Sequence, residues 1–74
     1  MTFQLWEIES ANLVGSYPTE GAALAVVRKA TETHGREAIA TLLLLREDAR
    51  GRLTKIAEGT ALGDLALAKT TPAA

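Results

Sequence analysis

The feature that most constrains the fold of this chain is a pattern that occurs twice: two short predicted strands followed by a helix with Thr at its N-cap position. The predicted strands are residues 3–10, 12–17, 38–46 and 52–58. The helices begin after Thr19 and after Thr60. This ββαββα order predicts an α+β domain in which two hairpins build a four-stranded antiparallel sheet, with one long and one short helix packed on one face.

The long helix is the most clearly marked element. Thr19 is a good N-cap, Glu20 in the first turn complements the helix dipole, and Gly35 is a natural terminator. Projection at about 100° per residue gathers one set of side chains on a narrow face: Ala23, Leu24, Val27, Ala30, Thr31 and His34. Because these side chains are mostly small, the helix can lie close against a sheet.

Two of the predicted strands carry apolar side chains on both faces. In the first strand, Trp6 and Ile8 share one face, while Phe3 and Leu5 share the other. We expect Trp6 and Ile8 to face the core, which leaves Phe3 and Leu5 partly exposed unless a second chain covers them. The third strand has leucine at each of positions 42–45, and such a strand requires cover on both faces. Helices can cover one face, and the other needs a second helix layer or another subunit.

Turn-forming residues indicate how the strands are joined. In the first hairpin, Asn12 can adopt the left-handed conformation and Gly15 suits a bulge or an edge strand. In the second, residues 48–51 (Asp-Ala-Arg-Gly) fit a type I turn closed by a glycine in a bulge position. Residues 70–74 are expected to form a disordered tail beyond a single domain of residues 1–69.

Composition and charge exclude several function classes. The chain has no cysteine, which rules out disulfides and thiolate metal sites. A net charge of −1 gives no electrostatic reason to expect nucleic acid or an anionic membrane as the main partner. The N-terminal residues lack the basic start and long apolar stretch of a signal peptide, and the longest apolar run, residues 39–45, is far too short to span a membrane. We therefore expect a cytoplasmic protein.

The residues that could carry catalysis are few. His34 is the only histidine, whereas a metal site needs three or four ligands, so we interpret it as a side chain that favours the helix dipole in the last turn. Glu7 and Glu9 are two apart on a strand, and such a pair can share a proton or bind a divalent cation. A short chain scarcely forms the cleft that this chemistry requires, and a solvated strand face is favoured. We expect no catalytic, metal or cofactor site, and no enzyme activity.

Half of the basic residues lie on the second hairpin. They are Arg46, Arg50, Arg52 and Lys55. Such a hairpin can follow phosphates in a groove, but Glu47, Asp48 and Glu58 dilute its charge and no exposed aromatic side chain is interleaved for stacking. An ordinary solvated hairpin is favoured, with weak nucleic-acid binding as an alternative.

Several strings of residues carry a resemblance that covers most of the chain. They are residues 5–8 (Leu-Trp-Glu-Ile), 12–17 (Asn-Leu-Val-Gly-Ser-Tyr), 19–24 (Thr-Glu-Gly-Ala-Ala-Leu), 42–46, Gly51 and 56–59 (Ile-Ala-Glu-Gly). They resemble short uncharacterised bacterial proteins, widespread in actinobacteria and related high-GC lineages, in which hairpin, helix and hairpin follow in this order. The resemblance spans residues 5–66 and implies a fold but no activity. A weaker similarity is to HicB-type antitoxins, in which a hairpin leads into a Thr-(Glu)-x-x-Ala helix; it implies a protein that neutralises a partner protein.

These patterns lead to one main hypothesis. Small domains bury a small fraction of their surface and are marginally stable alone, and here no disulfide can compensate. With the two-faced third strand, this predicts a non-enzymatic module that self-associates as a homodimer or higher homo-oligomer and binds another macromolecule. We expect the association surface to contain Phe3, Leu5, Leu43 and Leu45. An antitoxin-like or regulatory protein that binds its partner through a strand edge is the alternative.

Overall fold

Two β-hairpins, two α-helices and a short 3₁₀ helix make up residues 1–69, the part of the chain that the computed structural model describes. In chain order the elements are β1 (Thr2–Glu7), β2 (Asn12–Tyr17), α1 (Glu20–His34), η1 (Arg36–Ile39), β3 (Leu42–Glu47), β4 (Leu53–Glu58) and α2 (Gly59–Lys69). The tail predicted for residues 70–74 lies outside the described residues.

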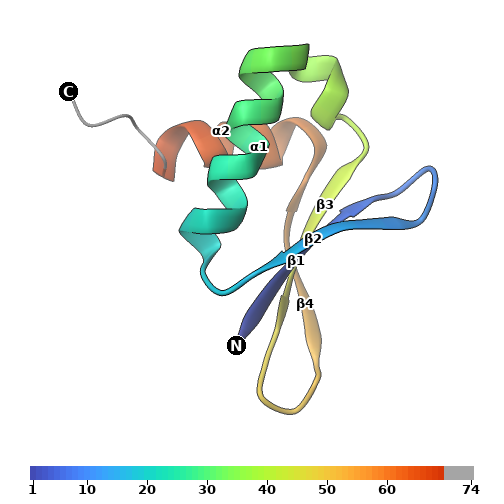
Figure 1. Ribbon diagram of the computed structural model, residues 1–74, viewed down its shortest axis with the longest axis vertical. Coiled ribbons are helices and arrows are strands. Elements are labelled where there is room, and N and C mark those ends of the chain that lie inside the picture. The colour runs from blue at the N-terminus through green and yellow to red at the C-terminus, as the bar shows by residue number, and fades with distance from the viewer. Residues whose placement is uncertain (70–74) are drawn as a thin grey trace.

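The four strands form one antiparallel sheet in the order β2-β1-β3-β4, so the first strand of each hairpin lies in the centre. Both α-helices lie on the same side of this sheet (Figure 1). Helix α1 contacts β1 and β2, and α2 contacts β3 and β4. The predicted fold class is therefore confirmed: a ββαββα domain with a four-stranded antiparallel sheet and helices on one face.

Helix α1 has the caps that its sequence predicts. The Thr19 side chain accepts a hydrogen bond from the backbone N–H of Ala22 at 3.1 Å. At the other end, Gly35 has a φ of 87°, and its N–H donates to the carbonyl of Thr31 at 2.9 Å. An L-residue is strained at this φ, which is why glycine is suited to end the helix.

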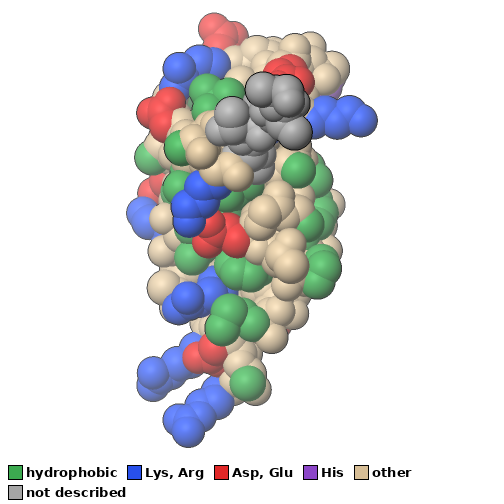
Figure 2. Space-filling view, turned by 90° about the vertical axis from the view of Figure 1, so that its left-hand side faces the viewer, with side chains coloured by type: hydrophobic (Ala, Val, Ile, Leu, Met, Phe, Trp, Pro, Cys, Tyr) green, Lys and Arg blue, Asp and Glu red, His purple; other side chains and the backbone are tan. Residues whose placement is uncertain are grey.

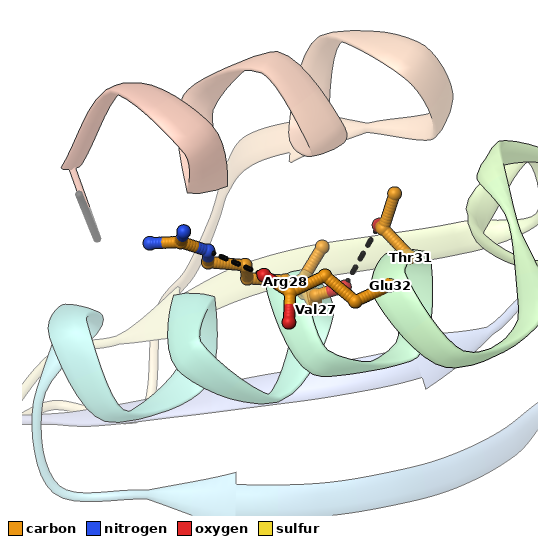
Figure 3. Close-up of polar contacts among 4 residues, drawn as sticks. All are labelled: Val27, Arg28, Thr31 and Glu32. Carbon is orange, nitrogen blue, oxygen red and sulfur yellow. Dashed lines mark hydrogen bonds and ion pairs between the residues drawn. The ribbon is translucent and has the colours of Figure 1, made fainter. Parts of the chain in front are cut away.

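Three polar side chains of α1 make contacts within the helix itself (Figure 3). The Arg28 Nε donates to Glu32 Oε1 at 2.9 Å, one turn further along. The Thr31 hydroxyl donates to the carbonyl of Val27 at 2.9 Å. The Arg28–Glu32 pair stabilises the helix slightly, and the bond to the Val27 carbonyl gives the Thr31 hydroxyl a partner within the helix.

The core lies between the helices and the β1 face that carries Phe3 and Leu5. Phe3 and Leu5 are 8% and 1% exposed, whereas Trp6 is only half-buried and Ile8 is 45% exposed. The expectation that Trp6 and Ile8 face the core is therefore wrong. The remaining buried core residues come from both helices, η1 and β3: Ala23, Leu24, Val27, Ile39, Leu42, Leu44, Leu62 and Ala66. Large apolar residues stand on both faces of β1, so alternation alone does not distinguish inside from outside.

The segment before β3 is a 3₁₀ turn and not the start of a strand. We expected a strand over residues 38–46, but β3 begins at Leu42. The N–H groups of Ala38 and Ala40 instead donate to carbonyls three residues earlier, both at 3.2 Å. This turn places Ile39, which is fully buried, beneath α2 at Gly63. Ile39 thus joins the core from a 3₁₀ turn and not from a strand.

Of the two predicted hairpin turns, the second is confirmed and the first is wrong. In the second, the N–H of Gly51 donates to the carbonyl of Asp48 at 3.0 Å and Gly51 has a φ of 80°, which confirms the predicted turn. In the first, Ala11 and not Asn12 has the positive φ, at 55°. The turn closes through the N–H of Ala11 to the carbonyl of Ile8 at 3.3 Å, so Asn12 is free to begin β2.

Candidate functional site

The face of the sheet opposite the helices is left uncovered by the described elements (Figure 1). The strand register arranges its central side chains in two neighbouring rows. We call these eight residues the open face: Leu13, Trp6, Leu43 and Glu58 in the first row, and Ser16, Gln4, Leu45 and Lys55 in the second. Each row crosses the sheet from β2 through β1 and β3 to β4.

A bulge in each outer strand gives the open face this composition. Between Leu13 and Gly15, Val14 is an extra residue with no partner in β1. Between Lys55 and Ala57, Ile56 is likewise extra opposite β3. A bulge shifts the following residues by one position, so residues three apart on the outer strand point to the same side of the sheet. This is how Lys55 and Glu58 come to occupy adjacent rows.

The centre of the open face is apolar. Trp6, Leu43 and Leu45 are half-buried and occupy neighbouring register positions, and Leu13 is 48% exposed. The indole Nε1 of Trp6 donates to Gln4 Oε1 at 3.0 Å, so the polar atom of the ring is satisfied within the face. A Trp with three leucines at neighbouring register positions on one face of the sheet forms an apolar patch of the kind that marks protein–protein contacts.

The β4 edge of the open face carries one ion pair. The Lys55 Nζ lies 2.8 Å from Glu58 Oε1, and these side chains are 57% and 48% exposed. An exposed pair of this kind adds little to the stability of the folded chain. The location of the pair matters more, because it places one positive and one negative charge side by side at the rim of an apolar surface.

Of the four residues predicted for self-association, the structure places two on the open face. Leu43 and Leu45 lie there, while Phe3 and Leu5 are buried beneath the helices and are not available to another chain. Sequence reasoning missed Trp6 and Leu13. The sequence does show that Gln4 stands two positions earlier on the same strand face as a partner for the indole N–H, but this pairing alone does not decide whether that face is inside or outside.

The four basic residues of the second hairpin do not form one surface. Lys55 pairs in register with Leu45 on the open face, whereas Arg46 pairs with Phe3 and Thr54 on the helix side. There the Arg46 Nε is buried with no hydrogen-bond partner among the described residues.

Arg50 and Arg52 are exposed at the turn, where their backbone N–H groups donate to the Asp48 carboxylate at 2.8 and 2.9 Å. Figure 2 shows Lys and Arg side chains at this lower end of the molecule beside acidic ones. The mixture of signs and the separation onto two faces weaken the case for a phosphate-binding hairpin.

Glu7 and Glu9 do not form a carboxylate pair on a strand, because β1 ends at Glu7 and Glu9 lies in the following turn. The Glu7 carboxylate accepts hydrogen bonds from the Ser10 hydroxyl at 2.6 Å, from the Ser10 N–H at 2.7 Å and from the Glu9 N–H at 3.3 Å. It therefore closes the first hairpin turn. Hydrogen bonds from the side chains of Ser10 and Thr41 and from the Ser10 backbone lower the pKa of Glu7 from 4.5 to about 2.

This shift predicts a pH dependence of stability. The folded pKa of Glu7 lies below its unfolded value, so its contribution is complete above about pH 4.5 and is lost as the pH falls through about 2. We expect Glu7→Gln to be less stable than the parent at pH 7 and to approach it near pH 2. Urea denaturation across this pH range measures the difference. A stability difference that does not change with pH would contradict the assignment.

The remaining candidates for chemistry do not come together. His34 is exposed in the last turn of α1. Within residues 1–69, no cavity is found and no three His, Cys, Asp or Glu side chains gather into a potential metal site. Over the same residues, no helix has both the length and the apolar character needed to cross a membrane.

Among the surfaces of the described residues, the open face is thus the best candidate for a functional site. Comparison with models of protein families, with curated protein sequences and with solved structures finds no match to this chain.

Proposed function

We propose that this protein is a small, non-enzymatic cytoplasmic module that self-associates as a homodimer through the open face and binds another macromolecule in that form. The observation that supports the proposal is the uncovered apolar surface of Trp6, Leu13, Leu43 and Leu45. Burying apolar area is worth about 25 cal/mol per Å², so a face of this composition gains from contact with a complementary surface.

The size of the face suits a reversible dimer. Four strands of six residues span roughly 19 by 20 Å, which is a flat area of about 400 Å² before the relief of the side chains is added. A standard interface buries about 800 Å² per partner, and weak associations bury less. The open face is therefore smaller than a standard interface and matches the size of weak associations, so we expect a dissociation constant in the micromolar range or weaker.

A second copy is the simplest occupant because two sheets that pack face to face make a β-sandwich with a shared core. Each copy would cover the half-exposed Leu43 and Leu45 of the other, as the third strand requires. Helices α1 and α2 of both copies would then face outward and stay accessible to a further macromolecule.

Two leucines with nearly equal exposure allow a matched test. Leu13 on the open face is 48% exposed, and Leu67 on α2 is 47% exposed. Glu at position 13 would bring an uncompensated charge into the interface, so we expect Leu13→Glu to raise the dimer dissociation constant about 30-fold or more, about 2 kcal/mol. Leu67→Glu should leave it within about threefold of the parent. Sedimentation velocity over a micromolar dilution series measures both.

Circular dichroism at low concentration provides the control that each variant is folded. A parent chain that stays monomeric at every concentration would overturn the proposal. If Leu13→Glu and Leu67→Glu weakened dimer association equally, the open face would not be the dimer interface. A stable one-to-one complex with a different protein, formed through a strand edge, would instead support the antitoxin-like alternative.

A further inference from the structure

We infer that the second copy binds in one defined orientation, in which Lys55 of each chain faces Glu58 of the other. This inference rests on the proposed function and adds to it the geometry of the interface. It follows from the two rows of the open face and from the charges at their β4 ends.

Two identical faces can pack about a two-fold axis that lies between them, perpendicular to the strands and midway between the rows. Such an axis places each strand over its own copy and exchanges the rows. Leu43 of one chain then faces Leu45 of the other, Trp6 faces Gln4, and the charged rims meet with opposite signs. The interface is isologous and closes at two copies.

An axis parallel to the strands is disfavoured. It places β4 of one chain over β2 of the other, so that Glu58 faces the apolar Leu13 and no opposite charge is brought near it. In both orientations Glu58 keeps Lys55 of its own chain as a partner, but only the first orientation adds a second opposite charge from the other chain when the rim is desolvated.

Edge-to-edge pairing is also disfavoured. Both outer strands carry a bulge, at Val14 in β2 and at Ile56 in β4. A bulge interrupts the row of backbone groups that a further strand would need, and Lys55 adds a charge to the β4 edge. The two edges are therefore poor templates, and the face is the surface left for association.

The orientation is tested with two charge reversals that are made in separate chains. Lys55→Glu gives a chain with two negative rim charges, and Glu58→Lys gives a chain with two positive ones. Each variant alone brings like charges together twice in the dimer, and we expect its dissociation constant to rise about tenfold or more. An equimolar mixture restores opposite charges only between chains, because each chain still carries like charges within itself.

We expect the mixture to associate within about threefold of the parent and to form mixed dimers well above the half that random pairing gives. Native mass spectrometry with one variant labelled with ¹⁵N counts the mixed species. The double variant Lys55→Glu/Glu58→Lys should associate like the parent, which controls for folding. If the parent is a dimer but the two variants pair at random in the mixture, the orientation is wrong and the proposed function stands. If the parent is a monomer, both are wrong.

Discussion

Leu44→Ala is expected to lower the free energy of unfolding by about 2–5 kcal/mol, which is the usual cost of truncating a fully buried leucine. Leu44 is fully buried between the helices and the sheet. The adjacent Leu43 has the same side chain on the same strand but lies on the open face and is only half-buried. Leu43→Ala should cost about 1 kcal/mol when the chain is dilute enough to be monomeric. Urea denaturation of both variants gives the two values.

This pair of variants tests which face of the sheet contains the core. A small domain has only a few kcal/mol of stability, so Leu44→Ala can leave the chain largely unfolded in water. If Leu43→Ala proved the more damaging change in dilute solution, the placement of Phe3 and Leu5 inside the domain would be wrong.

Gly63→Ala is expected to be destabilising although alanine is the better helix former. A Cβ at position 63 would overlap the Cδ1 of Ile39, so the Ile39 side chain, which is fully buried, would have to shift within the core. Overpacking of this kind costs about 1–3 kcal/mol, and the gain in helix propensity offsets roughly 1 kcal/mol of it. We expect a net loss of up to about 2 kcal/mol in urea denaturation.

Ile39→Val provides the control, because valine lacks the Cδ1 that a side chain at position 63 would meet. Alone it should cost about 0.5–1.5 kcal/mol. Combined with Gly63→Ala, it should cost less than the sum of the two single changes, since the clash has been removed. Strictly additive losses would show that Gly63 is not required by its contact with Ile39.

Local signals in the sequence were sufficient for most of the fold. The Thr19 cap, the Gly35 terminator and the turn that Gly51 closes depend on a few neighbouring residues, and each of them was predicted correctly. The chain order of strands and α-helices followed from the same local signals, but the predicted start of the second helix after Thr60 is wrong, because α2 already begins at Gly59. Each of these features is determined by residues within a few positions along the chain.

What could not be predicted depends on contacts between distant elements. Both faces of β1 carry large apolar residues, and the choice between them is made by the packing of α1 and α2. Likewise, Ile39 lies in a 3₁₀ turn and not in the predicted strand, and its side chain packs against α2 at Gly63. The same limit applies to the open face. Leu43 and Leu45 could be assigned to an association surface from the leucine run, but Trp6 could not be placed on it until the inner face of β1 was known.

The intrinsic fluorescence of Trp6 tests the central claim most directly, because it is the only tryptophan and lies in the middle of the open face. We expect its emission maximum to shift to shorter wavelength as concentration rises, with the same midpoint as the increase in mass seen by light scattering. Such a coincidence would mean that association buries Trp6. A mass that doubles while the emission of Trp6 stays unchanged would place the contact elsewhere and contradict the account.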